Sequence, residues 1–499
     1  MPAYAQRIIV AIAGAILVGA FAPFSYWWLT LICPALLYVS IINRSALDAF
    51  LLSIIFGLFF FGFGVPWTFN SIHEFGHAPI FLSAFLASLL VIVLTLFPAF
   101  STYIFCKLRC NAYFSFTSAL AFSSLWALFE WLRSWIFTGF PWLLLGHAHH
   151  SSPLQDVIPI FGTYGATWLA LLVSCLVVVI ALGKFRQKVL ALISLALVAL
   201  SLMVANQITW TQAEDEELSI ALVQGNISQE MKWDRTNHPF IMSKYMQLSE
   251  AHLDADIIVW PETAIPTYYT LVKDSFIKEL SETAQNNNVD FLVGVFTYDP
   301  SNGKVFNSVM ALGEGLSFYQ KQHLVPFGEY IPFRGLISFL DRYIQIPMED
   351  LSEGEGRPLV SLKGHPVGAS ICYEAVYGNE VIEALPDAKF LINVSNDAWF
   401  GDSLAPHQHL EIARSRAIET GRYLLRATNT GISAIIAPDG SIINKSVQFK
   451  EDVIRAKIQP YSGLTPYSRW GNWGIVTILF GIMFIICLYQ WKMQQRKQA

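Results

Sequence analysis

The segment Asp256-Ile-Ile-Val-Trp-Pro-Glu262 decides the fold, because it joins a short apolar run to a proline and an acidic side chain. Apolar runs of this length, bounded by polar stretches, predict buried strands. Similar runs recur at Leu218–Gln224, Phe291–Val295, Val305–Leu312, Val367–Ile371, Phe390–Val394 and Ala434–Ala437. Helical patterns lie between them, at Phe240–Leu253, Asp274–Asn286 and His407–Gly421. The alternation predicts an α/β domain in which helices cover buried strands.

Three reactive side chains lie at the ends of apolar segments. Pro261 ends the first strand and places Glu262 beyond its edge, Lys321 follows Tyr319-Gln, and Cys372 follows Val367–Ile371. Open α/β sheets carry their sites at such strand ends. A thiol nucleophile needs a base to take its proton and a cation or N–H group to hold the oxyanion. Together the three residues predict a nucleophilic site, although Glu262 or Lys321 alone would be interpreted as a solvated surface residue.

The composition excludes an ordinary soluble enzyme and a disordered chain. Of the 499 residues 54% are hydrophobic and 14% are charged, against about 25% charged in soluble domains. Residues 208–473 hold 21 Lys+Arg and 33 Asp+Glu, whereas the remainder holds only 11 and 4. A membrane span needs about 20 mostly apolar residues. Eight such runs are predicted, at residues 7–24, 26–43, 46–65, 80–105, 113–136, 157–182, 188–207 and 474–491.

The basic residues predict how these spans are oriented. Lys and Arg gather before the first run, after the second, fourth and sixth, and after the eighth, while the opposite loops hold almost none. Because cytoplasmic loops carry the excess of Lys and Arg, both termini are predicted to be cytoplasmic. The predicted domains are a seven-span membrane domain at 1–207, an exported catalytic domain at 208–473, and an eighth span with a basic tail at 474–499.

Cysteine usage singles out one thiol. The chain has six cysteines, of which only Cys372 lies within 208–473, so this domain has no internal disulfide. An unpaired thiol in an oxidising compartment calls for an explanation. It is either a buried, inert side chain or the nucleophile of the predicted site.

The three strand-end segments resemble the nitrilase superfamily, whose site is a Glu-Lys-Cys triad on an αββα sandwich. With the eight apolar runs, the chain resembles the membrane-embedded branch of that superfamily, the apolipoprotein N-acyltransferase family. The implied fold is a multi-pass α-helical membrane domain of eight spans plus an exported nitrilase-like α/β sandwich. The matching motifs are Ala22-Pro-Phe24, Thr138–Trp142, Val223-Gln-Gly-Asn226, Met231-Lys-Trp233, Trp260-Pro-Glu262, Lys321–Glu329, Ile371-Cys-Tyr-Glu374, Ser395–Gly401 and Gly463–Tyr467.

The resemblance implies a role for each matching residue. Cys372 would be the nucleophile and Glu262 the general base and acid. Lys321 would hold the oxyanion together with the backbone N–H of Tyr373. Glu329 matches an additional glutamate that positions the triad. Five residues match positions linked to substrate handling or site support, and packing or a buried hydrogen bond explains them equally well: Trp233, Asn307, Tyr373, Glu374 and Trp399.

The implied reaction is ping-pong acyl transfer at the periplasmic face of the bacterial inner membrane. Cys372 would take an acyl chain from the sn-1 ester of a phospholipid, commonly phosphatidylethanolamine, and pass it to the α-amine of the S-diacylglyceryl cysteine of an apolipoprotein. No cofactor, metal or nucleic acid is implied, and a monomer is expected. The segment Phe333–Leu351 is rich in apolar side chains, and we expect it to be a lid that faces the bilayer and gates lipid entry.

Other functional classes stay open at this point. A membrane-tethered amidase or nitrilase would keep the triad but release its product to water. The motif His73-Glu74-Phe-Gly-His77 fits the helical zinc signature of metalloproteases, although Gly76 and Pro79 oppose a helix there. Glu130, an acid within the fifth run, is compatible with a transport path, but Arg133 can pair with it along one helix.

Overall fold

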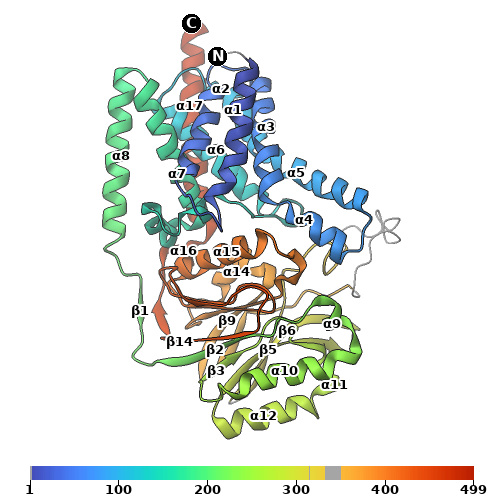
Figure 1. Cartoon of the computed structure of the whole chain (residues 1–499). Coiled ribbons are helices and arrows are strands. Elements are labelled where there is room, and N and C mark those ends of the chain that lie inside the picture. The colour runs from blue at the N-terminus through green and yellow to red at the C-terminus, as the bar shows by residue number, and fades with distance from the viewer. Residues whose placement is uncertain (1–2, 314, 332–349, 499) are drawn as a thin grey trace. The chain divides into compact units, whose positions relative to one another are not determined.

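A computed structural model of the protein describes residues 3–313, 315–331 and 350–498. The chain forms two compact units (Figure 1). The first comprises Met1–Phe69, Phe81–Thr209 and Arg469–Ala499, and the second comprises Asn70–Ile80 and Trp210–Ser468. Of the expected lid at Phe333–Leu351, all but Asp350 and Leu351 lies outside the described residues.

The first unit is helical, and a helix occupies each of the eight predicted apolar runs. The helices are α1 (Ala3–Leu17), α2 (Leu29–Ile41), α3 (Ala46–Gly64), α5 (Ile80–Lys107), α6 (Phe116–Arg133), α7 (Ile158–Leu182), α8 (Phe185–Ala205) and α17 (Asn472–Gln498). Five helical segments in the described part of the chain, in α3, α5, α7, α8 and α17, are long and apolar enough to cross a membrane. Helices α1 and α2 are shorter than a typical span, so eight crossings stay a prediction.

Burial separates two kinds of helix in this unit. In α8 only 6% of the most apolar window is buried, although its mean hydropathy is 2.4. Such an uncovered apolar surface is typical of a helix that faces lipid. Helix α6 has the opposite character, because its buried side chains include Ser118, Ser123, Ser124 and Glu130. It is an interior helix, in which Ser118 accepts a hydrogen bond from the Tyr38 hydroxyl and Glu130 accepts one from the Thr167 hydroxyl.

The second unit contains two main β-sheets. The seven-stranded sheet has the order β14-β2-β3-β5-β6-β7, with β4 paired to β5. Its strands are β2 (Leu218–Gln224), β3 (Ile257–Val259), β4 (Ile265–Tyr268), β5 (Asp290–Asp299), β6 (Lys304–Leu312), β7 (Leu316–Gln320) and β14 (Asp452–Ile458). The six-stranded sheet has the order β13-β12-β11-β10-β9-β8. Its strands are β8 (Leu359–Leu362), β9 (His365–Ile371), β10 (Leu391–Ser395), β11 (Leu424–Thr428), β12 (Ala434–Ile436) and β13 (Ile442–Lys445).

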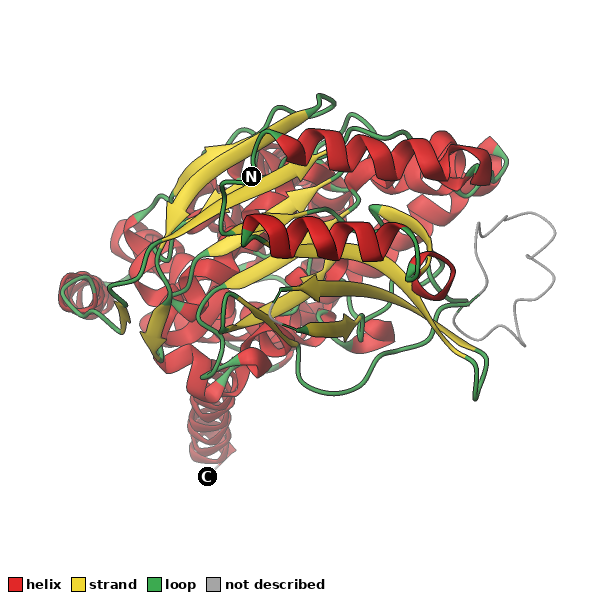
Figure 2. Ribbon diagram, turned by 90° about the horizontal axis from the view of Figure 1, so that it is seen from below, coloured by secondary structure: helices red, strands yellow, loops and turns green. Residues whose placement is uncertain are grey.

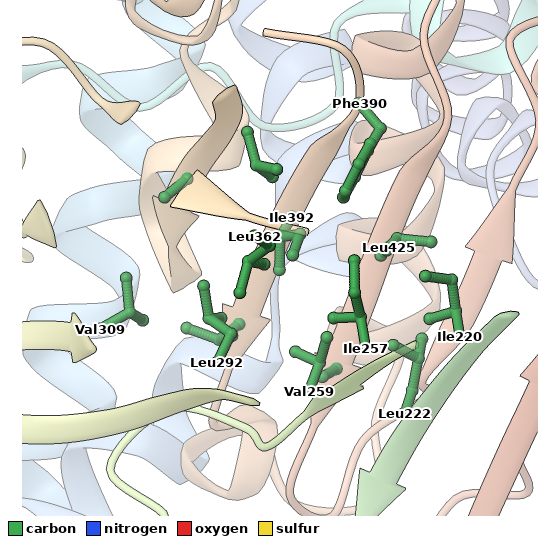
Figure 3. Close-up of a cluster of buried hydrophobic side chains, with 14 of the residues drawn as sticks. Ile220, Leu222, Ile257, Val259, Leu292, Val309, Leu362, Phe390, Ile392 and Leu425 are labelled. Atoms are coloured by element: carbon green, nitrogen blue, oxygen red, sulfur yellow. The ribbon is translucent and has the colours of Figure 1, made fainter. Parts of the chain in front are cut away.

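The two sheets pack face to face, and a helical layer covers each outer face. Figure 3 shows side chains of both sheets in one buried cluster, with Ile220, Val259 and Leu292 from one sheet and Ile392 and Leu425 from the other. Helices α10 (His238–Glu250) and α12 (Phe276–Asn287) pack on the seven-stranded sheet (Figure 2). Helices α14 (Gly378–Val381) and α15 (Ala405–Thr420) pack on the six-stranded sheet. This unit is the expected αββα sandwich.

The central strands are parallel, which brings the predicted strand ends together. Strand β3 is parallel to β2 and β5 in one sheet, and β10 is parallel to β9 and β11 in the other. Each predicted strand of this unit is present within a few residues of its expected position, whereas the two main sheets also contain β4, β7, β8, β11, β13 and β14, which were not predicted. Strand β11 is the instructive omission, because Arg426 at its centre breaks the apolar pattern.

Candidate active site

The thiol of Cys372 lies where β9 ends and the short 3₁₀ helix η8 (Cys372–Val376) begins. Cys372 has a φ of +53°, a left-handed conformation that is uncommon for a side chain other than glycine. The residue is buried, with 9% of its surface exposed. A strained residue at a strand end persists only where its surroundings hold it in place.

A buried polar network beneath Cys372 supplies that support. The Cys372 carbonyl accepts hydrogen bonds from His409 Nε2 at 3.2 Å and from Asn393 Nδ2 at 3.4 Å. Arg426 on β11 donates to Asp397 Oδ2 at 2.8 Å and to His409 Nδ1 at 2.9 Å. Since a carbonyl only accepts, His409 must carry its proton on Nε2. Burial and Arg426 lower the pKa of His409, which keeps its ring neutral in that tautomer.

The carboxylates and the amine of the predicted site lie on the other sheet. Glu262 follows β3, and its Oε1 accepts a hydrogen bond from Asn307 Nδ2 at 2.7 Å. Lys321 follows β7, and its Nζ lies 2.8 Å from Glu329 Oε2 and 4.0 Å from Glu262 Oε1. Asn307 Nδ2 also lies 3.2 Å from Glu329 Oε1. Asn307 therefore ties the two glutamates to each other, and its position favours site support.

The pKa shifts indicate how protons are distributed before reaction. Burial and the neighbouring Glu262 raise the pKa of Cys372 to about 12, so the resting group is a neutral thiol. Burial lowers the pKa of Lys321, but Glu329 and Glu262 together raise it by more than burial lowers it. The pKa of Lys321 therefore lies above its ordinary value. Burial raises the pKa of Glu262, while Lys321 lowers it. The site therefore holds a thiol, a charged amine and a carboxyl whose proton affinity is increased.

Glu374 supports the backbone around the site. It accepts hydrogen bonds from the Tyr319 hydroxyl at 2.8 Å, from the backbone N–H groups of Gln322 and His323, and from that of Ile371. Burial raises the pKa of Glu374 to about 7, although Lys321 and these hydrogen bonds lower it. One carboxyl group thus fixes the segment after Lys321 to the residue before Cys372.

The remaining predicted residues surround this centre. Trp233 ends α9 (Gln229–Trp233) and contacts Phe296, in a cluster with Leu324 and Leu351. Its Nε1 is buried and has no hydrogen-bond partner in the described part of the protein. The ring of Tyr373 lies 5.3 Å from that of Tyr377 and 5.8 Å from that of His323. A cavity of about 400 Å³ is lined by Lys304, Leu324, Tyr330, Leu351, Ser352, Glu353, Gly354 and Glu355, none of which is a predicted site residue.

Trp399 contacts a segment that lies between two long helices of the first unit in sequence. Residues Asn70–Ile80 belong to the second unit, where Ser71 Oγ donates to the Trp399 carbonyl at 2.8 Å. The Phe75 ring lies 5.6 Å from the Trp399 ring. The same segment carries the zinc-like motif, but His77 has a φ of +49° and lies beyond the helical turn Ser71–Phe75. The two histidines therefore do not share one helix face, which the zinc signature requires.

Sequence reasoning did not identify four residues of this centre as functional. Asp397, His409 and Arg426 come from three separate elements, and their types show no diagnostic spacing. Lys232 lies within the quoted motif Met231-Lys-Trp233, and its Nζ donates to the Glu262 carbonyl at 2.9 Å. Only 2% of Lys232 is exposed. The sequence does not reveal this burial, because a lysine beside a tryptophan in a short helix is normally solvated.

Known proteins similar to this chain match both units. The family model for the apolipoprotein N-acyltransferase N-terminal domain matches residues 13–176, and that for carbon-nitrogen hydrolases matches residues 219–467. The apolipoprotein N-acyltransferase of Methylococcus capsulatus is 38% identical over 96% of this chain and 95% of its own length. The apolipoprotein N-acyltransferase of Coxiella burnetii is 38% identical over 97% of this chain and 100% of its own length.

A solved nitrilase-superfamily structure, Nit3 of Saccharomyces cerevisiae, is 21% identical and covers 50% of this chain and 93% of its own. Its TM-score of 0.39 is too low to carry an argument. The full-length relatives decide the assignment, because each spans nearly all of both chains at well above 30% identity. The chain belongs to the apolipoprotein N-acyltransferase family.

Proposed function

We propose that the protein moves an acyl chain from a phospholipid to the N-terminal α-amine of a diacylglyceryl apolipoprotein through a thioester on Cys372. One observation carries the proposal: Cys372, Glu262 and Lys321 are all buried at strand ends of the two facing sheets, and both charged groups act electrostatically on the Cys372 thiol. Glu329 and Asn307 hold the glutamate and the lysine in place. No cofactor takes part in the proposed reaction.

The first half-reaction forms the thioester. Glu262 removes the proton of Cys372, and Sγ attacks the carbonyl carbon of the sn-1 ester. Lys321 and the Tyr373 N–H stabilise the oxyanion as the S–C bond forms. The ester C–O bond then breaks, and Glu262 returns the proton to the departing alkoxide of the lysophospholipid. Phosphatidylethanolamine is the proposed donor, and a monomer suffices because one chain supplies all these groups.

The second half-reaction consumes the thioester. The α-amine of the lipoprotein attacks the thioester carbon, a C–N bond forms, and the C–S bond breaks. Glu262 takes the proton released by the amine and returns it to the Cys372 thiolate. Trp233 is proposed to contact a substrate, because its buried Nε1 has no partner among the described residues and can donate to a substrate oxygen.

The membrane arrangement is also a proposal. We infer eight spans in the inner membrane, with both termini cytoplasmic, the membrane domain at 1–207 and 474–499, and the catalytic domain 208–473 in the periplasm. The excess of Lys and Arg at alternate loops supports this orientation. The uncovered apolar surfaces of α5 and α8 support contact with lipid.

Introduced cysteines test the orientation, because the native ones are buried or half-buried. A membrane-impermeant maleimide should label Lys278→Cys, on the exposed side of α12, once the outer membrane is permeabilised and while the inner membrane is still intact. It should label Arg186→Cys, in the first turn of α8, only after the inner membrane is opened. The reverse pattern would contradict the proposed orientation.

Intact mass measurement tests the proposed chemistry. Purified full-length protein incubated with phosphatidylethanolamine should gain one acyl mass that hydroxylamine removes, and peptide mapping should place it on Cys372. Cys372→Ala should gain none, whereas Cys106→Ala, the same change in helix α5, should behave as wild type. An adduct that persists in Cys372→Ala would overturn the assignment of the nucleophile.

A further inference from the structure

A second lysine lies in the candidate site behind Glu262. Lys232 is on the short helix α9, whose first turn is capped by the Ser228 side chain. Only 2% of Lys232 is exposed, and its Nζ donates to the main-chain carbonyl of Glu262 at 2.9 Å. A lysine is almost never fully buried unless its charge is balanced nearby. A negative charge close to Lys232 is therefore expected.

The charges of the recognised site do not balance without this residue. Lys321 lies 2.8 Å from Glu329 but 4.0 Å from Glu262, so its charge is shared and favours Glu329. The hydrogen-bond donor closest to the Glu262 carboxyl is Asn307, which is neutral. One amine thus faces two carboxyl groups in a buried site. A buried carboxylate is costly unless it is paired, and Lys232, whose amine is bonded to the Glu262 main chain, is the second buried amine beside it.

We propose that Lys232 is a positioning residue whose charge, anchored on the Glu262 carbonyl, keeps the Glu262 carboxyl ionised so that it can take the Cys372 proton. The inference rests on the proposed role of Glu262 as the general base. The two lysines then have different roles. Lys321 pairs with Glu329 and stabilises the oxyanion, whereas Lys232 acts on Glu262 from its main-chain side.

The electrostatic surroundings agree with this division. Burial raises the pKa of Glu262, Lys321 and Lys232 lower it, and Glu329 raises it. Burial lowers the pKa of Lys232 to about 8, while Glu262 and Cys372 raise it. The groups that face Glu262 are therefore Lys321, Glu329, Cys372, Asn307 and Lys232. Loss of the Lys232 charge should raise the pKa of Glu262 further.

The pH dependence of Cys372 acylation tests the inference. Full-length protein in detergent is mixed with phosphatidylethanolamine between pH 5 and 9, and the rate of adduct formation is followed by intact mass. A base must be ionised to act, so the rate falls as the pH drops through the pKa of Glu262. A raised pKa of Glu262 moves this acid limb of the profile to higher pH. Lys232→Gln keeps a hydrogen-bond donor but removes the charge. Its acid limb should shift upward by about one pH unit, which lowers the rate by up to about tenfold at pH values on that limb and leaves the rate on the plateau above it unchanged.

Matched variants separate the charge from packing. Lys232→Arg should keep the wild-type acid limb, because it keeps the charge. Lys244→Met, which removes an amine from the surface pair with Glu451, should leave the profile unchanged. If Lys232→Gln folds poorly, Lys232→Met and the pH dependence of Cys372 alkylation provide the same comparison.

The outcomes of this experiment are distinguishable. A Lys232→Gln profile that is lowered uniformly, with its acid limb unmoved, would overturn the inference and leave a purely structural lysine. An acid limb that shifts equally in Lys232→Arg would overturn it as well. Failure of the wild-type protein to form any adduct would instead reject the proposed function.

Discussion

The two halves of the candidate site are built in different ways. On the six-stranded sheet, Cys372 sits on a buried network in which Arg426 donates to Asp397 and His409, and His409 donates to the Cys372 carbonyl. On the seven-stranded sheet, Glu262 receives one short hydrogen bond and lies 4.0 Å from Lys321. The proposed nucleophile rests on a buried ion pair, whereas the proposed base accepts its short hydrogen bond from the neutral Asn307. The difference suggests that one half is built for stability and the other for proton transfer.

Isosteric changes of one acid in each half test the comparison most strongly. Glu262→Gln removes the proposed general base and should lower the rate of Cys372 acylation by about 10²–10⁴-fold. It should not lower the melting temperature at neutral pH, because the raised pKa of Glu262 means that its ionisation opposes folding above its ordinary value of 4.5. Acylation kinetics and thermal unfolding are measured on the same sample. A strongly destabilised Glu262→Gln would remove the distinction between the halves.

Asp397→Asn is the counterpart in the other half. It leaves the buried guanidinium of Arg426 without a carboxylate and should reduce the free energy of unfolding by about 3–5 kcal/mol. Denaturant or thermal unfolding of the full chain provides the measurement. Asp254→Asn, which breaks the exposed pair with Arg455, serves as the control and should change stability by at most about 1 kcal/mol. Equal effects of the two substitutions would contradict the account.

The same comparison predicts a pH dependence of stability. Burial raises the pKa of Asp397, but Arg426 holds it well below its ordinary value of 3.8. A carboxyl group with a depressed folded pKa stabilises the protein above the ordinary value, and that stability is lost as the pH falls through the folded pKa. The stability difference between wild type and Asp397→Asn should therefore shrink below about pH 4. A difference that stays constant down to pH 2.5 would show that Asp397 acts through packing alone.

A smaller effect is expected at Glu374, whose hydrogen bonds form a clamp between the two halves of the site. Tyr319→Phe removes one of the four donors to Glu374 and leaves three backbone N–H groups in place. The expected loss is about 1 kcal/mol of stability, with the acid limb of acylation unchanged. Tyr298→Phe, an exposed tyrosine of β5, is the matched control and should have no measurable effect. A shift of the acid limb in Tyr319→Phe would mean that the clamp controls Glu262.

Sequence reasoning located the strands that end before Glu262 and Cys372 because those features are local. An apolar run followed by Pro261 and Glu262, or by Cys372, is visible without any tertiary information. Strand β11 was missed because Arg426 interrupts its apolar pattern, and only the distant Asp397 makes that charge acceptable inside a strand. Lys232 was missed for a related reason, since its burial depends on contact with Glu262 thirty residues away.

The measurement that tests the central claim most directly is the fate of the isolated acyl-enzyme. Wild-type protein charged from phosphatidylethanolamine is freed of lipid and mixed with a diacylated lipopeptide, or with the same lipopeptide acetylated at its α-amine. The account predicts that only the free amine discharges Cys372, with the acyl mass appearing on the lipopeptide and the thiol restored. Discharge at the same rate with the acetylated peptide, with the acyl chain released as free fatty acid, would contradict acyl transfer and identify a hydrolase.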